Sequence, residues 1–422
     1  MTFKLSDFGN RLSGEAGILQ LMDDLGDALA SGAPKAMFGG GNPAHIPAVT
    51  TVFEQSLQQL LKDPKQTAAM FGNYDTPQGN EAFIAACVTF FNREYGWGIT
   101  RDNIAITPGS QNGFFMLFNL LAGQREGKQR RIMLPLVPEY IGYVDQQIEP
   151  DGFVSQRPRI ETIGKHEYKY HVDLDQLTID ESVAALCVSR PTNPTGNVLS
   201  DEEVAELAVR AKAADIPLII DNAYGLPFPG VVQVPATLPW DKDNGNIVLS
   251  FSLSKIGLPS SRVGIFVGPP QLMRALSKAN AIVSLSSPSF GQYVMAPLLE
   301  SGKVSELATE HIQPYYLERA RTAREQMFAQ FPDELPWRLH KYEGAYFFWL
   351  WCEGAKKSAS EMYSYLKERG VIVVPGQYFF PGQTDDWPHT RECLRLNFAR
   401  PDAELQAGIP ILAEMIRWAY EK

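Results

Sequence analysis

The sequence has little cysteine, and this excludes several classes of protein. Only four of its 422 residues are cysteine, and they show neither a Cys-x-x-Cys pair nor any other zinc-site spacing. Three of them lie in apolar surroundings, so we expect reduced, unpaired thiols and a cytoplasmic location, with no metal site. The four are Cys87, Cys187, Cys352 and Cys393.

Positive charge and long apolar runs are also scarce. The formal net charge is −10, and no run of lysine or arginine occurs, which argues against nucleic acid or an anionic membrane as the main partner. No uninterrupted apolar run approaches the length of a membrane span, and the first ten residues lack the basic and apolar regions of a signal peptide. Internal repeats and low-complexity linkers are absent as well. With 45% hydrophobic residues, the chain can still bury a large core.

Short apolar runs alternate with helical patterns between about residues 100 and 270. The runs are apolar almost throughout, as in strands that are covered on both faces. We predict strands at 103–107, 131–135, 184–189, 217–220, 247–251 and 263–267. Helices are predicted at 111–122 and 201–214, the second with Ser200 as N-cap and Glu203 completing a capping box. This alternation predicts an α/β fold with a parallel, doubly wound core.

The pattern changes after about residue 290. We predict a long helical stretch, then strands at 343–351, 371–375 and 394–398, and helices at 358–369 and 402–420. Gly408 and Pro410 are expected to break or kink the last helix. We therefore predict a large domain over 42–290 and a smaller α+β domain formed by 1–41 and 291–422.

The most informative segment is SFSLSKIGLPSSRVG, in which Lys255 follows the predicted strand 247–251. Open α/β sheets bind ligands in the crevice at the carboxyl ends of their strands. A buried amine there has a lowered pKa and can form a Schiff base with pyridoxal phosphate (PLP). Alone, such a lysine could equally lie in solvent, so the prediction depends on other groups that a PLP site requires.

Those groups follow other predicted strands. Asp221 ends the strand 217–220 and can pair with a protonated pyridine nitrogen, and Tyr224 can donate to the ring's 3-oxygen. Asn193 lies in the rigid turn RPTNPTG, where its amide can reach the cofactor oxygen and a substrate carboxylate. An N-cap aspartate and an ordinary turn remain the alternatives for these segments.

A phosphate cradle is predicted where Gly109, Ser110 and Gln111 open a helix, because backbone N–H groups and the helix dipole attract anions there. Ser252 and Arg262 could add phosphate contacts, and the ring of Tyr140 could stack on the cofactor. A capped helix start and a packed core tyrosine are the alternatives.

A substrate carboxylate also requires a clamp. Arg395 lies in the alternating strand CLRLNFA, where a charged side chain is costly unless it is paired. We predict that it binds the carboxylate, with an internal salt bridge as the alternative. The glycines up to Gly41 could bring a backbone N–H close to the same carboxylate.

Taken in order, the segments GGGNP, YDTPQG, GSQ, PEY, RPTNPTG, DNAY, SLSK, SRVG, EGAYFFWL and RLNFA resemble the fold-type-I PLP-dependent aminotransferases, the aspartate aminotransferase superfamily. The resemblance spans nearly the whole chain. VSRPTNPTGNV, DNAYGLPFPG, SLSKIGLP and FGGGNPAHIP are similar, more narrowly, to bacterial members that act on valine and pyruvate.

The resemblance implies a role for each matching residue. Lys255 would bind PLP covalently and move the α-proton, while Arg395, Gly41 and Asn193 would bind the substrate carboxylate. Tyr74 resembles the family tyrosine that reaches the phosphate of the neighbouring subunit, which implies a homodimer with shared active sites. The implied cofactor-binding residues are Lys255, Asp221, Tyr224, Asn193, Ser110, Gln111, Tyr140, Ser252, Arg262 and Tyr74. Two departures stand out: Arg262 follows Lys255 by seven residues where relatives often have eight, and Gln111 replaces a small or hydroxyl residue.

The implied activity is transamination with ping-pong kinetics between valine, or a related aliphatic amino acid, and pyruvate. The sequence offers no confident second arginine for a side-chain carboxylate, and small and aromatic residues are abundant near the N-terminus and at 284–290. A β-lyase on the same scaffold would differ only in its products. A PLP-sensing regulator would need a DNA-binding module, for which the short, acidic N-terminus leaves no room. A non-catalytic α/β binding protein would leave Lys255 unmodified.

Overall fold

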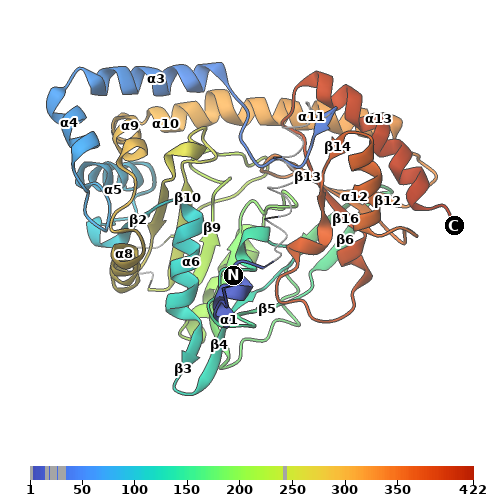
Figure 1. The fold of residues 1–422 in the computed structure, drawn as a ribbon, viewed down its shortest axis with the longest axis horizontal. Coiled ribbons are helices and arrows are strands. Elements are labelled where there is room, and N and C mark those ends of the chain that lie inside the picture. The colour runs from blue at the N-terminus through green and yellow to red at the C-terminus, as the bar shows by residue number, and fades with distance from the viewer. Residues whose placement is uncertain (1–2, 15–18, 20–25, 27–34, 241–244) are drawn as a thin grey trace.

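Three β-sheets, of eight, six and two strands, are surrounded by helices in this computed structural model, which describes residues 3–14, 19, 26, 35–240 and 245–422. Figure 1 shows the larger sheet near the centre, with β12, β13 and β16 of the second sheet to its right. The chain has an α/β fold, as the sequence predicts.

The larger sheet has eight strands and is mainly parallel. Its order is β2 (Ile104–Thr107), β11 (Gly264–Val267), β10 (Ile247–Ser252), β9 (Leu218–Asp221), β8 (Val183–Ser189), β4 (Lys128–Leu134) and β3 (Gly123–Arg125), and β5 (Phe153–Ser155) also pairs with β4. The six predicted strands are confirmed in type, with ends shifted by a few residues. Every residue of β8, β9 and β10 is buried, which explains their uninterrupted apolar sequence.

The direction of β11 differs from the prediction of a parallel core. β11 runs antiparallel to both β10 and β2. Only residues 253–263 connect β10 to β11, and they hold the functional loop rather than a helix long enough for a crossover. The chain therefore turns back directly beside β10.

Several helices pack against strands of this sheet. Predicted helices 111–122 and 201–214 are α6 (Ser110–Leu121) and α7 (Asp201–Ala213), and the capping box of Ser200 and Glu203 is confirmed. The sequence reading did not assign the remaining helices in this part of the chain. These are α1 (Asp7–Leu12), α3 (Pro47–Leu61), α4 (Pro64–Gly72), α5 (Glu81–Tyr95) and α8 (Pro270–Ser284), whereas α9 (Ser289–Glu300) falls at the start of the helical stretch predicted after about residue 290.

The second sheet joins distant parts of the chain. Its order is β15 (Val374–Pro375), β16 (Cys393–Asn397), β13 (Phe347–Cys352), β12 (Trp337–His340), β7 (Glu167–His171) and β6 (Arg159–Ile163). The predicted strand 343–351 begins only at Phe347, because Ala345 adopts a left-handed φ of 56° in the preceding turn. β6 and β7 were not predicted, since β6 carries mostly exposed polar residues.

The predicted strand 371–375 is divided at residue 373. Its first part, β14 (Val371–Ile372), pairs in parallel with β1 (Ala36–Met37), while β15 pairs with β16. The N-terminal segment is thus tied to the C-terminal part of the chain just before the glycines at 39–41.

Two long helices cover this region. The helical stretch expected after residue 290 includes α10 (Lys303–Glu306), a π-helical turn at Leu307–Ile312 and α11 (Gln313–Gln330), which follow one another across the top of Figure 1. Predicted helix 358–369 is α12 (Ala359–Glu368), and α13 spans Asp402–Ala419. Contrary to expectation, Gly408 and Pro410 do not break α13: Gly408 is buried against Phe38, where a Cβ atom would lie 2.5 Å from the ring.

Candidate active site

The polar residues predicted at the strand ends come together at one edge of the larger sheet. Asp221 ends β9, Ser189 ends β8 beside it, and Ser252 ends β10 on the other side. Because these strands are parallel, their carboxyl ends meet, and the loops that follow them converge. Lys255 and Asn193 are carried by two of those loops.

Lys255 lies among buried groups of both signs. Its Nζ donates a hydrogen bond of 3.0 Å to the carbonyl oxygen of Gly41 and lies 5.3 Å from the centre of the Tyr224 ring. Burial lowers the pKa of Lys255 to about 8, and the positive charge of Arg395 adds to this effect while Asp221 opposes it. A substantial fraction of the amine is therefore unprotonated near neutral pH, as nucleophilic and basic chemistry requires.

Asp221 is buried and held from two sides. The Tyr143 hydroxyl donates to its Oδ2 at 2.7 Å, and the backbone N–H of Ala223 donates to Oδ1 at 3.1 Å. Burial raises the pKa of Asp221 to about 6, although both donors and the charge of Lys255 oppose the shift. The carboxyl is thus held rigidly in a position suited to a cationic ring nitrogen.

The start of α6 has donor groups that suit an anion. Gly109 precedes it with φ of 84°, no side chain caps the helix, and the buried Ser110 Oγ has no hydrogen-bond partner. The Arg262 guanidinium lies against Gly109, where a Cβ atom would approach its Nη2 to 2.4 Å. Free N–H groups, a hydroxyl and a guanidinium are the donors that a phosphate requires. The seven-residue interval therefore still brings Arg262 to the predicted place.

The other predicted cofactor residues lie nearby. Gln111 donates from Nε2 to the carbonyl oxygen of Gly142, two residues after Tyr140. The ring of Tyr140 packs edge-on against Tyr143 at 5.4 Å between centroids. Ser252 accepts a hydrogen bond from the backbone N–H of Ser254 at 3.2 Å.

Arg395 is 2% exposed, and no described carboxylate pairs with it, so the alternative of an internal salt bridge is wrong. It donates from Nη1 to Asn193 Oδ1 at 2.9 Å and from Nη2 to the carbonyl oxygen of Gly39 at 2.7 Å, while Nε has no partner. Its guanidinium lies 4.4 Å from the centre of the Phe347 ring. Burial lowers the pKa of Arg395 to about 10, and the group remains a cation at neutral pH.

Three predicted residues are placed in ways that the sequence did not indicate. The glycine loop offers carbonyl oxygens, with Gly41 accepting from Lys255, whereas the prediction concerned its N–H groups. Asn193 accepts from Arg395, which leaves its Nδ2 group as the donor. Tyr74 is 82% exposed and, among the residues described, has no hydrogen-bond partner, so it stands outside the cluster of this single chain.

Sequence reasoning missed three residues of the cluster. Tyr143 holds Asp221, Ser254 accepts from Arg262 Nη1 at 3.4 Å, and Glu139 is a buried carboxyl beside Ser189. Tyr143 and Glu139 belong to the segment PEYIGY, of which only Tyr140 was assigned a role. The second tyrosine of this segment, three residues after Tyr140, was the available sequence signal for Tyr143.

Comparison with known proteins identifies the family. A sequence model described as aminotransferase class I and II matches residues 39–410, which include the glycine loop, Lys255 and Arg395. The chain belongs to this family. The fold and the arrangement of buried charges described above are thus those of a class I and II aminotransferase.

The similarity to individual proteins extends over whole chains. This aminotransferase is 43% identical to the valine–pyruvate aminotransferase of Escherichia coli strain K12, over 100% of this chain and 99% of the relative. A putative amino-acid aminotransferase from Psychrobacter arcticum 273-4 shares 42% identity and a TM-score of 0.95, covering 99% of both chains. The valine–pyruvate aminotransferase of Salmonella typhimurium LT2 shares 42% identity with a TM-score of 0.87, covering 96% of this chain and 99% of that one.

Enzymes of this family use PLP, and the residues of this aminotransferase fit that cofactor. The unpartnered Ser110 hydroxyl, the uncapped start of α6 and Arg262 suit its phosphate. Asp221 suits its pyridine nitrogen, and the amine of Lys255 suits its aldehyde. All of these residues lie within one chain.

One prediction concerns the protein without its cofactor. We expect Asp221→Asn to abolish activity but to stabilise the apoprotein near neutral pH, because burying the charged carboxylate is unfavourable. The pKa of Asp221 is raised from 3.8 to about 6 on folding, so stability is lost as pH rises from about 4 through 6 and stays lost above that. The gain from asparagine should thus be larger at about pH 8 than at about pH 5, and at most roughly 3 kcal/mol.

Urea unfolding of the wild-type and D221N apoproteins at the two pH values measures this difference. Ser252→Ala, which changes no titrating group, serves as the control and should show no pH-dependent difference from wild type. If D221N raises the free energy of unfolding by the same amount at both pH values, the result would contradict the raised pKa assigned to Asp221.

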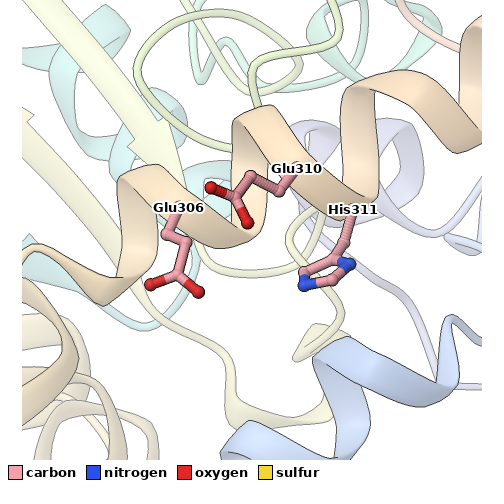
Figure 2. A group of neighbouring side chains, drawn as sticks. All are labelled: Glu306, Glu310 and His311. Carbon is pink, nitrogen blue, oxygen red and sulfur yellow. The ribbon is translucent and has the colours of Figure 1, made fainter.

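A second group of side chains lies on the long helix that includes α10 and α11. Figure 2 shows Glu306, Glu310 and His311 on this helix, and their ligand atoms lie within 4.8 Å of one another. Glu306 already pairs with Lys303, and Glu310 is exposed. Because such partly neutralised surface groups are common, we assign no metal to them.

Within the described ranges, no helix has both the length and the apolar character needed to cross a membrane.

Proposed function

We propose that this aminotransferase exchanges the amino group between valine, or a related aliphatic amino acid, and pyruvate, forming 3-methyl-2-oxobutanoate and alanine. The observation that carries the proposal is the 43% identity over the entire chain to a valine–pyruvate aminotransferase.

The cavity next to Lys255 supports an aliphatic substrate. It has a volume of about 130 Å³, and its lining contains no arginine and no carboxylate among the residues described. Apolar groups from the loop after Gly41, from α3 and from the π-helical turn face it, including Pro43, Ile46 and Ile312. Lys255 and His45 are the basic residues of the lining, and it contains no arginine that could bind a side-chain carboxylate in a bidentate manner. An apolar pocket separates neighbouring aliphatic side chains by only ~1–3 kcal/mol, so related amino acids should also react.

The residue roles form part of the proposal. PLP, when bound, supplies the aldehyde that accepts the amino group and a ring that stabilises negative charge at the α-carbon. Arg395 and the Gly41 backbone hold the substrate carboxylate, with Asn193 beside them. The unprotonated amine of Lys255 would remove the proton from the substrate α-carbon and deliver it to the aldehyde carbon of the cofactor. Asp221, held by Tyr143, keeps the pyridine nitrogen protonated, while Tyr224 and Asn193 address the 3-oxygen.

The remaining roles concern binding. Ser110, Gln111, Ser252 and Arg262 hold the phosphate, and Tyr140 covers one face of the ring. We also propose a large domain of residues 42–290, a small domain of 1–41 with 291–422, and a cytoplasmic location.

We propose further that two copies of the chain form a homodimer in which Tyr74 completes the partner's phosphate site. The exposed side chains of Phe71, Tyr74 and Ile282 support this, with exposed fractions of 75%, 82% and 87%. Apolar surface of this extent favours burial against another chain.

The sequence prediction that residues 284–290 contribute to specificity concerns the end of α8 and the start of α9, close to Ile282. Most of the N-terminal segment named with them lies outside the described residues.

The experiment is a spectral titration of the purified protein. We expect valine to convert the PLP absorption band to that of pyridoxamine phosphate, and pyruvate to restore it. Glutamate, whose side chain carries a carboxylate, should react at least tenfold more slowly. A band that ignores valine but responds to another amino acid contradicts the substrate assignment. Release of pyruvate and ammonia from an amino acid without any acceptor would indicate a β-lyase instead.

A further inference from the structure

Glu139 is a buried carboxyl that none of the roles above uses. It lies in the loop after β4, directly before Tyr140, and is 1% exposed. Burying a carboxyl group is unfavourable unless its oxygens are hydrogen-bonded, so such a residue requires a specific reason.

Its hydrogen bonds join three separate segments. The backbone N–H of Ser189 donates to Oε1 at 2.7 Å, and the Ser189 hydroxyl donates to Oε2. The backbone N–H of Tyr140 donates to the same Oε2 at 3.2 Å. The N–H of Glu139 itself donates to the carbonyl oxygen of Phe379 at 2.8 Å. One residue thereby connects the end of β8, the loop of Tyr140 and the segment after β15.

The sheet explains why this carboxyl is required. The pairing of β4 with β8 reaches only Met133 and Leu186, so the last residues of β8 have no neighbouring strand on that side. The side chain of Glu139 accepts the N–H of Ser189 in place of a strand. On its other side, Ser189 is in register with Asp221, and the next N–H, that of Arg190, donates to the Asp221 carbonyl oxygen at 2.8 Å.

All three segments carry groups that surround the proposed cofactor site. Tyr140 is the stacking residue, β8 leads into the turn of Asn193, and the ring of Phe379 lies 5.5 Å from the Arg395 guanidinium. The loop of Tyr140 has no regular secondary structure to fix it other than one short helical turn at Ile141–Tyr143. Its position relative to Asp221 therefore depends on side-chain contacts: the hydrogen bond of Tyr143 to Asp221 and that of Gln111 to Gly142 hold its far end, and Glu139 holds the end that carries Tyr140.

We propose that Glu139 is a positioning residue, which holds Tyr140 and the end of β8 in fixed relation to Asp221 so that the ring of PLP is clamped between them. This inference rests on the cofactor-binding roles in the proposed function. It does not depend on which amino acid is the substrate.

Glutamine cannot replace Glu139 without losing a contact. Oε2 accepts the Tyr140 N–H whether or not the carboxyl is protonated, and both forms matter because burial raises the pKa of Glu139 to about 8. An amide carries an NH2 group on one of the two positions, and that group would face either the Tyr140 or the Ser189 backbone N–H. Either orientation places two donors against each other.

The test measures the binding of pyridoxamine phosphate, which cannot bond covalently to Lys255, to apoprotein variants. We expect Glu139→Gln to raise its Kd about tenfold or more and to change the visible circular dichroism of the bound cofactor, because the ring loses its fixed stacking. Ser189→Ala removes only the hydroxyl contact and should raise the Kd less than threefold.

Glu203→Gln is the matched control. Glu203 is also a buried carboxyl that accepts two backbone N–H groups, those of Val172 and Ser200, but it belongs to the capping box of α7. The E203Q substitution should lower Tm and leave both the Kd for pyridoxamine phosphate and the dichroism of the bound cofactor unchanged. The inference is overturned when E139Q behaves like E203Q, with a lower Tm but a wild-type Kd and dichroism.

A further variant covers the case in which E139Q does not fold. Glu139→Asp keeps the carboxyl but is one methylene shorter, so it cannot reach Ser189 and Tyr140 together, and the same Kd and dichroism criteria apply to it. The spectral titration of the wild-type protein with valine tests the proposed function separately. Failure there leaves the comparison of pyridoxamine phosphate affinities unaffected.

Discussion

Lys255→Ala should lower kcat/KM for transamination about 10⁴-fold, the largest effect that we expect from any single substitution. The substitution removes both the amine that bonds to the cofactor and the base that moves the α-proton, and positioned general bases contribute up to ~10⁴-fold. Alanine at this position leaves the donors of the phosphate site and Asp221 intact. The variant should consequently still bind PLP, without a covalent bond.

Borohydride reduction followed by mass spectrometry measures that bond. Wild-type protein should retain the mass of the reduced cofactor on the peptide that contains Lys255, and K255A should retain none. Lys212→Ala, which removes an exposed lysine from α7, is the control and should match wild type in both measurements. Substantial transamination by K255A would show that another group moves the proton.

Arg395→Lys should lower kcat/KM for valine and for pyruvate by about 10²- to 10³-fold. The guanidinium holds Asn193 and the Gly39 carbonyl oxygen while presenting further N–H groups, and a single ammonium cannot make these contacts together. Losing one partner of a buried charged pair costs ~2–5 kcal/mol, which corresponds to this range. Because every amino acid and oxo acid substrate carries the α-carboxylate, the loss should be similar for all of them.

Steady-state kinetics with several amino acids and oxo acids tests this expectation. The control is Arg321→Lys, at an exposed arginine on α11 that pairs with Glu318, and it should leave kcat/KM unchanged. A loss confined to one substrate would mean that Arg395 recognises a side chain rather than the shared carboxylate.

Much of this site could be predicted from sequence because of how a parallel sheet is built. Strands that are buried on both faces are apolar throughout, so β8, β9 and β10 are visible as short runs, and the residues that end them must meet. Asp221, Ser252 and Lys255 are predictable in this way from the sequence. Their chemical types then limited the ligand to a carbonyl compound with a basic nitrogen and a phosphate.

Other features depend on geometry that no local pattern records. The reversal of β11 follows from a short connection, and the addition of β6 and β7 to the second sheet follows from pairing with β12 far along the chain. Tyr143 and Glu139 act through side chains whose directions depend on an irregular loop. The role proposed for Tyr74 requires a second copy of the chain, so one chain cannot display it.

The contact between Arg395 and Gly39 joins positions 356 residues apart, and that between Lys255 and Gly41 joins positions 214 apart. During synthesis, β16 leaves the ribosome after every strand of the larger sheet. A nascent chain that ends before β16 already contains the residues of that sheet and of the start of α6, but it lacks Arg395, the residue proposed to bind the substrate carboxylate. The residues proposed to hold the cofactor are thus synthesised before the proposed carboxylate clamp.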